Sequence, residues 1–367
     1  MKEAAFDDDV KANSLERVWI AKANAIQRKG RAGRTRPGKL YRLYSKARYM
    51  EIMSDFSVPA MQREALDSLI LRLCGMNLTA DPRDILRRCL DTPDETRMNK
   101  SIEKLRRLNA IDTRFALTPL GFQLNRMGVD PEIGKMIMYG LCFGCYRPIS
   151  IVAAALSHKS PFVKLNDAAK IKAQHHTRLE LGVNSQSDMV AIMMAYEKWA
   201  SEGMMSFQWA DQHFLSQIVM SMINRIVEDF NARLAKTNFA LDQRGCESWD
   251  RNSNYVNVIT QVLSGVLLPK VVTSKRKHVE TSQKVKISDE SVIAFNNIDC
   301  SLGTFYEMLK LQSNRNLWNA WELNPCTDLT LLLFQKPMKI GQNILSWFGE
   351  GRFELTYRNF FNTEKTI

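Results

Sequence analysis

The sequence predicts a mainly α-helical protein with β modules (α+β), and three observations support this fold class. Apolar residues recur at helical spacing from about residue 60 to about residue 236. Short β-rich runs cluster after about residue 255. Hydrophobic residues make up 45% and charged residues 25% of 367 residues, which is ordinary globular usage and enough chain for two or three domains. A mainly disordered, collagen-like or coiled-coil protein is therefore excluded.

The positive charge of the chain is concentrated at one place. Lys and Arg number 51 against 39 Asp and Glu, which gives a net charge of +12. Eleven basic residues and no acidic residue fall in the segment 17–48, so the rest of the chain sums to about +1. One basic block on a nearly neutral body favours a partner that carries phosphate groups, and a solvated basic face is the alternative.

The sequence gives no indication of a membrane, an export signal or a metal site. No apolar run approaches the roughly 18 to 20 residues of a membrane span, and the first ten residues lack signal-peptide character. Seven cysteines at irregular spacing favour reduced thiols, and hence a nuclear or cytoplasmic localisation. Cys142 and Cys145 form a CxxC pair, but no second Cys or His pair follows at zinc spacing, so we expect no metal there.

The first 118 residues combine short strands with helices. Val18–Ile20 and Leu40–Tyr44 are expected as strands on either side of the basic block, with Pro37-Gly38 as a turn signal. Three helices are expected next, over 60–75, 81–90 and 96–108, and a short strand is expected over 115–117. Three helices and a short strand within about 60 residues match the plan of a winged-helix module.

The middle of the chain is expected to be helical. Helices are predicted to begin at Pro119, at Pro131 and at Pro148, and to span 188–200 and 214–234. Frequent methionines in these helices favour adaptable core packing over a ligand groove. His175 and His176 are expected in a solvated loop.

The last third of the chain is expected to form a small β-barrel. The predicted strands are 265–269, 271–273, 284–287, 304–309 and 329–334. Lys275, Arg276 and Lys277 lie between two of these strands and precede His278, so we expect a basic loop. That loop is a candidate RNA phosphate contact or import signal, and a solvated loop is the alternative.

The segment from Gln27 to Arg34 carries the strongest chemical signal. On a helix, Arg31 and Arg34 would lie about 40° and about −20° from Gln27, so the three side chains would share one face. Two guanidinium groups and one carboxamide suit a phosphoryl group undergoing hydrolysis, because arginine neutralises developing charge and an amide can orient water. Gly30 and Gly33 each cost about 0.8–1 kcal/mol in a helix, which suggests a close approach to the backbone.

The run from Gln27 to Ser45 resembles motif VI of superfamily 2 helicases, specifically of the DEAH-box RNA helicases. Leu117–Gly121 and Asp130–Met136 resemble the junction into the helical ratchet domain of that family. The runs around Gly265–Pro269 and Phe305–Glu307 are similar to the oligonucleotide-binding (OB) barrel of its RNA helicase A-like branch.

The resemblance implies a domain order. Residues 1–50 would be the C-terminal remnant of the second RecA-like helicase domain, 51–118 a winged helix, and 119–240 a helicase-associated ratchet domain. Residues 241–350 would form the OB-fold and 351–367 a C-terminal tail.

The resemblance also implies roles for the motif. Arg31 and Arg34 would be arginine fingers, Gln27 would position the hydrolytic water, and Gly30 and Gly33 would complete the nucleotide-binding segment. ATP and Mg²⁺ would be bound mainly by a RecA-like domain N-terminal to this sequence. Single-stranded or structured RNA and a helicase cofactor protein are the expected partners, and no membrane is expected.

The sequence contains neither a Gly-x-x-x-x-Gly-Lys-Ser/Thr P-loop nor an Asp-Glu-Ala-His motif. It therefore predicts the C-terminal part of an ATP-dependent RNA helicase, without ATPase activity by itself. A self-standing RNA-binding or adaptor protein derived from a helicase is the alternative, and an inhibitory paralogue is a third reading. A native polypeptide much larger than 42.1 kDa would support the first.

The first 49 residues carry one further expectation. If Val18–Ile20 and Leu40–Tyr44 belong to a parallel sheet, their neighbouring strands precede residue 1, and their backbone groups and apolar side chains are uncovered. We therefore expect a chain that begins near Pro59 to be more soluble.

Overall fold

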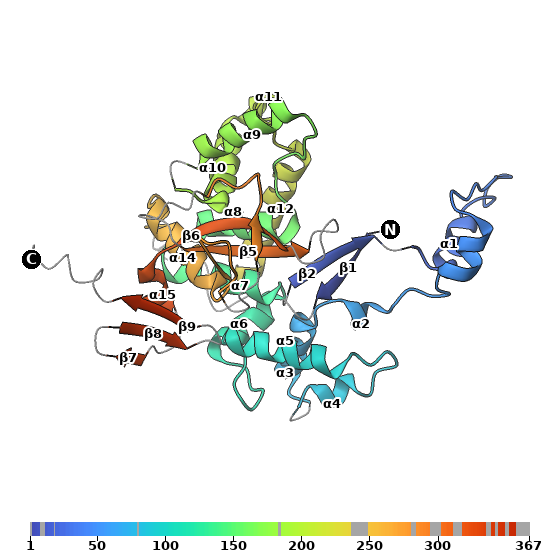
Figure 1. The fold of residues 1–367 in the computed structure, drawn as a ribbon, viewed down its shortest axis with the longest axis horizontal. Coiled ribbons are helices and arrows are strands. Elements are labelled where there is room, and N and C mark those ends of the chain that lie inside the picture. The colour runs from blue at the N-terminus through green and yellow to red at the C-terminus, as the bar shows by residue number, and fades with distance from the viewer. Residues whose placement is uncertain are drawn as a thin grey trace, which may run out of the picture.

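The computed structural model describes residues 2–7, 12–17, 19–78, 81–182, 185–235, 249–279, 284–293, 302–310, 318–334, 339–341, 344–348 and 352–356. Figure 1 shows a central helical body with a curled sheet beside it and an arm of helices above it. The segment around α1 extends to one side of the body, and the strands nearest the C-terminus lie at the opposite side.

The N-terminal part forms a hairpin, a helix and a short π-helix. Strands β1 (Lys2–Asp7) and β2 (Ala12–Arg17) pair antiparallel, and β2 lies near β5 (Leu302–Lys310) (Figure 1). Helix α1 (Lys22–Lys29) follows, and η1 (Arg48–Ile52) is the π-helix.

The expected strands at Val18–Ile20 and Leu40–Tyr44 are wrong for every residue that the structure describes. Trp19, Ile20 and 40–44 lie in no strand, and Val18 lies outside the described residues. A strand needs a hydrogen-bonded neighbour, and β1 and β2 pair with each other instead. Tyr44 stacks on Tyr49 of η1, with the ring centroids 6.2 Å apart.

The next region contains the expected helices with altered bounds. They are α2 (Ala60–Arg63), α3 (Asp67–Met76), α4 (Arg83–Leu86), α5 (Glu95–Arg107) and α6 (Pro119–Met127). The single helix expected over 60–75 is broken at Glu64, whose backbone is extended. Arg97 of α5 donates to the carbonyl oxygens of Gln62 and Glu64, which helical bonding no longer uses.

Two further expectations for this region are confirmed in a shorter form. The helix expected over 81–90 ends at Leu86, and the chain continues in turns. The strand expected at 115–117 is reduced to one antiparallel bridge between Ile111 and Leu117.

The helical body contains the helices expected at Pro131, Pro148, 188–200 and 214–234. Its elements are α7 (Pro131–Cys142), α8 (Tyr146–His158), α9 (Ala168–Leu181), α10 (Asp188–Ser201), η2 (Gly203–Met205), α11 (Ser206–Gln212), α12 (Gln217–Ala235) and α14 (Val256–Leu267). Asp130 caps α7 by accepting hydrogen bonds from the amides of Glu132 and Ile133, and Pro131 fixes its first turn.

Two expectations in this part are wrong. His175 and His176 lie within helix α9, not in a solvated loop. Gly265–Pro269 is not a strand, because α14 continues to Leu267. Its apolar run is buried against the other helices, and a short apolar run has the same appearance in a buried strand and a buried helix.

The β module is a curled four-stranded sheet in the order β3 (Val271–Thr273), β5, β6 (Trp318–Cys326), β4 (Val285–Ile287). Strand β4 runs parallel to β6, whereas the other pairs are antiparallel. The strand expected at 329–334 is wrong, because these residues form helix α15 (Asp328–Phe334). Phe334 of α15 packs against Tyr139 and Phe143 and so joins the sheet to the helical body.

A separate antiparallel sheet contains β7 (Lys339–Gly341), β8 (Ile344–Phe348) and β9 (Arg352–Thr356). Strand β9 lies in the part of the chain expected to be a tail, and its pairing with β8 shows regular structure there. Residues 357–367 lie outside the described residues.

One large hydrophobic core extends from Leu66 to Leu267, and two smaller clusters belong to the β module. Buried methionines such as Met136, Met189 and Met220 confirm their expected role in core packing. None of the described helices combines the length and the apolar character needed to cross a membrane.

Candidate functional site: an exposed arginine turn and a basic loop

Helix α1 is fixed at its N-terminal end. The amides of Lys22 and Ala23 donate to the carbonyl oxygens of Ser54 and Asp55 at 2.8 and 3.0 Å. The ammonium group of Lys22 also forms an ion pair with Asp55 at 3.0 Å. These contacts satisfy amides that a helix N-terminus leaves free, and they determine where the residues after α1 begin.

Arg31 and Arg34 lie beyond the end of α1. The amides of Arg31 and Ala32 donate to the carbonyl oxygens of Arg28 and Lys29, each at 3.1 Å, and Gly33 has φ +80°. The chain therefore does not continue as a helix through Arg34, because Gly33 adopts a left-handed conformation that turns it.

The glycine of the Pro37-Gly38 turn signal allows a close backbone approach. A Cβ at Gly38 would lie 3.1 Å from the amide nitrogen of Gly33 and 3.3 Å from the Ala32 Cβ. The chain after Pro37 therefore folds back onto the Ala32–Gly33 turn and keeps the segment compact.

The functional side chains predicted for this segment all face solvent. Gln27, Arg31 and Arg34 are exposed, as is every residue from Ile26 through Arg42. The Nε of Arg34 donates to the carbonyl oxygen of Gly30 at 3.1 Å, which orients its guanidinium group. Gln27 thus lies on α1 and Arg31 and Arg34 lie in the turn after it, and the charge of the two guanidinium groups is available to an anion.

Sequence reasoning missed a cluster of aromatic and cationic side chains behind this turn. The guanidinium of Arg42 lies 4.6 Å from the ring centroid of Tyr49, and that of Arg48 lies 4.5 Å from the ring of Trp19. Such cation–π contacts at exposed sites contribute roughly 0.5–1 kcal/mol each. They secure the return of the chain from the turn into η1.

The basic loop lies on the β module, away from α1. Lys275, Arg276 and Lys277 are exposed, and Lys277 forms an isolated bridge with Lys284. His278, expected in the same basic loop, is instead buried beside the ring of Phe305. The structure therefore does not place the two sets of predicted residues on the same element.

A buried ion network was not predicted. Lys270 contacts Glu132 at 2.9 Å, and Lys104 contacts Asp67 at 2.6 Å and Glu132 at 3.9 Å. Burial raises the pKa of Glu132, but the ammonium groups of Lys270 and Lys104 outweigh burial and lower that pKa to about 2. The network joins α3, α5, α7 and the start of β3, so its role is structural.

The two cysteines of the CxxC pair differ in their exposure. Cys142 is exposed at the end of α7, whereas Cys145 is buried, and burial raises the pKa of the Cys145 thiol to about 12. Across the residues that the structure describes, no group of three or more His, Cys, Asp or Glu side chains could hold a metal ion.

An exposed turn with Arg31 and Arg34, a helical body and a curled sheet are compatible with the class of protein that the sequence resembles, the C-terminal portion of a DEAH-box RNA helicase. Comparisons with known proteins support this class. Residues 130–205 match the family described as "Helicase associated domain (HA2), ratchet-like". The match extends from the N-cap of α7 to the end of η2.

Similar proteins identify the family. The chain is 33% identical to the ATP-dependent DNA/RNA helicase DHX36 of Homo sapiens over 293 residues, which are 78% of this chain and 29% of that protein. It is 34% identical to the DExH-box ATP-dependent RNA helicase DExH1 of Arabidopsis thaliana over 284 residues, 77% of this chain and 28% of that protein. The chain spans less than a third of the length of these relatives. It belongs to the DEAH-box RNA helicases and corresponds to their C-terminal portion.

Proposed function

We propose that this chain is the C-terminal part of an ATP-dependent RNA helicase, which couples NTP hydrolysis to movement along RNA and to its unwinding. In this proposal the chain supplies arginine fingers and RNA-binding surfaces. Its relatives are named as ATP-dependent helicases, which supports the proposal. The observation that carries it is the exposure of Gln27 on α1 and of Arg31 and Arg34 in the turn that follows.

The proposed chemistry of the turn is electrostatic. Arg31 and Arg34 neutralise charge that develops on the γ-phosphate, and Gln27 orients the attacking water. Guanidinium groups that face solvent on an anchored turn can meet a nucleotide held by a neighbouring domain. Gly30 and Gly33 keep the backbone of the turn accessible to it.

The residues present fit the phosphate part of the nucleotide and not its metal. Arg31 and Arg34 are donors without acceptor atoms, which suits phosphate oxygens. The described residues offer no cluster of carboxylates for Mg²⁺. ATP and Mg²⁺ are therefore assigned mainly to a RecA-like domain N-terminal to this sequence.

The remaining modules are proposed to hold RNA. Residues 51–118 are assigned to a winged helix, 119–240 to the ratchet domain and 241–350 to an OB-fold, and together they enclose single-stranded RNA. The basic loop at Lys275–Lys277 is assigned a phosphate contact. A helicase cofactor protein is a further proposed partner, and the proposed localisation is nuclear or cytoplasmic.

The purified chain tests this function. We expect it to bind single-stranded RNA with an affinity that falls as salt is raised, and to show no ATP turnover with or without RNA. The fingers contribute roughly 10³ to 10⁵ in rate only to a nucleotide site that already exists. Steady turnover that Arg34→Ala abolishes would contradict the proposal, because it would show a complete site within this chain.

A further inference from the structure

The start of helix α10 lies against the β module and is hydrogen-bonded to it (Figure 1). The carboxylate of Asp188, the first residue of α10, is buried and accepts hydrogen bonds from the Ser291 hydroxyl at 2.6 Å and from the amide of Val292 at 2.8 Å. It also accepts from the amide of Leu323 on β6 at 2.9 Å. One carboxylate therefore joins the helical arm to two segments of the β module.

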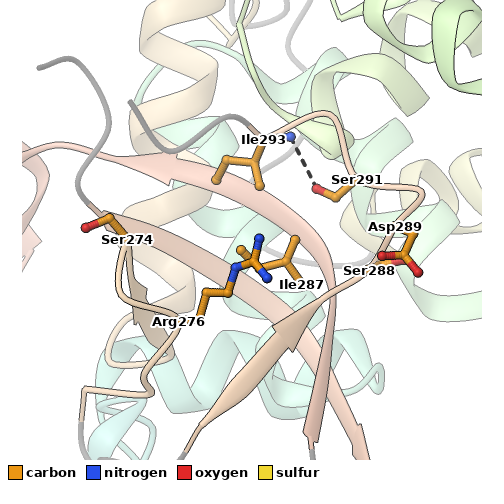
Figure 2. A pocket seen from close by; sticks show the side chains of 7 residues that line it. All are labelled: Ser274, Arg276, Ile287, Ser288, Asp289, Ser291 and Ile293. Carbon is orange, nitrogen blue, oxygen red and sulfur yellow. Dashed lines mark hydrogen bonds between the residues drawn. The ribbon is translucent and has the colours of Figure 1, made fainter. Parts of the chain in front are cut away.

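The first of these segments, 288–293, follows β4 and lies in no helix or strand. Figure 2 shows it beside a polar cavity of about 350 Å³, to which the turn after β3 contributes Ser274 and Arg276. On the side of the arm, the guanidinium of Arg178 on α9 donates to the carbonyl oxygen of Glu290 at 3.1 Å and forms an ion pair with its carboxylate at 3.0 Å. Polar contacts with α9 and α10, which lie within the ratchet-like match, thus help to hold the segment in place.

Glu322 lies on β6 beside this junction, in an unusual backbone conformation. Its φ is +52°, a left-handed region that residues with a side chain rarely adopt. The pairing of β6 with β5 includes Trp321 and Leu323 but not Glu322 between them. Such a conformation persists where its surroundings over-determine it, and it often accompanies a functional role.

The groups that face Glu322 carry more negative than positive charge. Asp188 of α10 and Glu290 of the segment 288–293 are carboxylates, whereas Arg178 of α9 is the opposing cation. The ion pair of Arg178 is made with Glu290, so its charge is already compensated. Three ionised carboxylates beside one guanidinium would leave an uncompensated negative charge in a largely buried junction, which is unfavourable.

Two further titratable groups flank the junction and are engaged elsewhere. From α9, the Nε2 of His175 lies 3.2 Å from the carbonyl oxygen of Ser291. The ammonium group of Lys164 lies 5.7 Å from the ring centroid of Trp321. Neither side chain forms an ion pair with Glu322 among the described residues.

The surroundings of Asp188 and Glu322 favour different forms of the two carboxyl groups. Burial raises the pKa of both. Asp188 accepts three hydrogen bonds, two of them from backbone amides, and these favour its ionised form. For Glu322, the charge of Asp188 adds to the effect of burial and raises the pKa to about 7. One proton shared by the two groups is therefore held by Glu322.

We propose that Glu322 and Asp188 form a proton-operated latch between the helical arm and the β module. With a proton on Glu322, the latch is closed and the segment 288–293 is seated against α9 and α10. Loss of that proton to solvent places a second carboxylate beside Asp188 and loosens the segment. This inference goes beyond the proposed helicase function, because it links the contact between the ratchet-like arm and the sheet to pH.

The closed latch should weaken as pH rises. The Glu322 carboxyl group has its ordinary pKa of 4.5 when the segment is released and a pKa of about 7 when the latch is closed. The closed state is therefore fully favoured below about pH 4.5, weakens by up to about tenfold per pH unit between these values, and levels off above about pH 7.

Hydrogen–deuterium exchange of the full chain between pH 5 and pH 8 tests the latch. Rates are expressed as protection factors, which remove the intrinsic effect of pH on amide exchange. We expect the protection of the Val292 and Leu323 amides, which bind Asp188, to fall about tenfold between pH 5 and pH 7 and then to level off. Amides of α5, which lies outside the junction, should keep constant protection.

Glu322→Gln tests the titrating residue, and Glu307→Gln is the matched control. The neutral amide resembles the protonated carboxyl group, so Glu322→Gln should keep both amides protected at every pH. Glu307 lies on β5 opposite Trp321, and the cation that faces it is Lys270 of the buried ion network. Glu307→Gln should therefore retain the wild-type pH profile.

Glu290→Gln is a second variant that tests the charge balance without altering β6. Its amide oxygen can still accept a hydrogen bond from Arg178, but one carboxylate that faces Glu322 is removed. The pH at which protection levels off should fall by about one unit.

Three outcomes would overturn the latch. They are protection of the two amides that is independent of pH in the wild-type chain, an equal pH profile in Glu322→Gln and the wild-type chain, and an unchanged levelling pH in Glu290→Gln. Loss of the pH dependence in Glu307→Gln would assign the titration to β5 and would also overturn it.

Discussion

The segment around α1 and the α7–α8 pair organise their residues in opposite ways. Every residue from Ile26 through Arg42 is exposed, whereas most residues of α7 and α8 are buried. The exposed segment is anchored by contacts at its ends, and the helical pair is fixed along its whole length by side-chain packing. The residues of the first region are therefore constrained by the side chains that they expose to solvent. The residues of the second region are constrained by the side chains against which they pack.

The largest expected effect on stability comes from the packed region. Ile149 of α8 is fully buried, and the Cβ position of Gly140 on α7 would lie 3.0 Å from the Ile149 Cβ. Ile149→Ala should lower the free energy of unfolding by about 2–5 kcal/mol, because it leaves a cavity at a close helix contact. Urea denaturation followed by circular dichroism measures this.

Leu43→Ala is the control from the exposed region. Leu43 is 97% exposed, so its truncation should change stability by no more than about 0.5 kcal/mol. Equal losses in the two variants would show that the comparison between the regions is wrong.

Disruption of the buried ion network should give the next largest effect on stability. The pKa of Glu132 is depressed to about 2 by Lys270 and Lys104, against an ordinary value of 4.5. Its contribution to stability is therefore complete above about pH 4.5 and is lost as pH falls towards 2. Glu132→Gln should cost about 2 kcal/mol at pH 7 and should flatten this acid dependence, as measured by unfolding between pH 2 and 7. An unchanged acid profile would contradict the role of Glu132.

A smaller effect on stability, with the opposite pH dependence, is expected where the helical arm meets the sheet. Burial raises the pKa of Glu322 on β6, and the neighbouring carboxylate of Asp188 raises it further, to about 7. A raised carboxyl pKa gives stability that is present below the ordinary value of 4.5 and is lost as pH rises through 7.

Glu322→Gln tests this point. The neutral amide should remove the loss and stabilise the chain by about 1 kcal/mol at pH 8, with little change at pH 5. Urea midpoints at the two pH values measure it. Identical pH dependence in the variant and the wild-type chain would assign the loss to other groups.

The smallest effect on stability is expected from removal of the N-terminal segment. The large core begins at Leu66, and the hydrogen bonds that anchor α1 end on Ser54, Asp55 and Ser57, all within the removed part. A chain that begins near Pro59 should keep its melting temperature within a few degrees and should be more soluble, since it lacks the exposed apolar side chains around α1. Unfolding of the shortened chain would show that the N-terminal segment is part of the fold.

Local sequence signals predicted the helical part well. Asp130-Pro131 and Thr118-Pro119 specify helix starts by a side-chain cap and a fixed φ, which depend on neighbouring residues alone. Gly265–Pro269 and 329–334 were misassigned because short apolar runs do not distinguish a buried helix from a strand. Strand β6 was missed since its Asn, Glu and Pro residues are poor strand formers, and its pairing with β4 and β5 overrides that preference.

The candidate site was predictable in its residues and not in its shape. Charge and spacing singled out Gln27, Arg31 and Arg34, but α1 ends at Lys29 and the chain turns at Gly33, so no helix aligns the three side chains. The cavity at Arg276 needed the fold, because its walls come from loops that are brought together by strand pairing. No local pattern links Ser274 to Ser288.

The central claim is that Arg31 and Arg34 act on the nucleotide. Its most direct test measures ATP turnover and RNA affinity of the complete helicase with Arg31→Ala or Arg34→Ala. The control is Arg36→Ala, at a nearby exposed arginine to which no role on the nucleotide is assigned. The account predicts that kcat falls by about 10³ or more in the two motif variants while RNA affinity changes by less than about threefold, and that Arg36→Ala retains turnover. Equal losses of turnover and RNA affinity in the motif variants would contradict it and assign the turn to the RNA backbone.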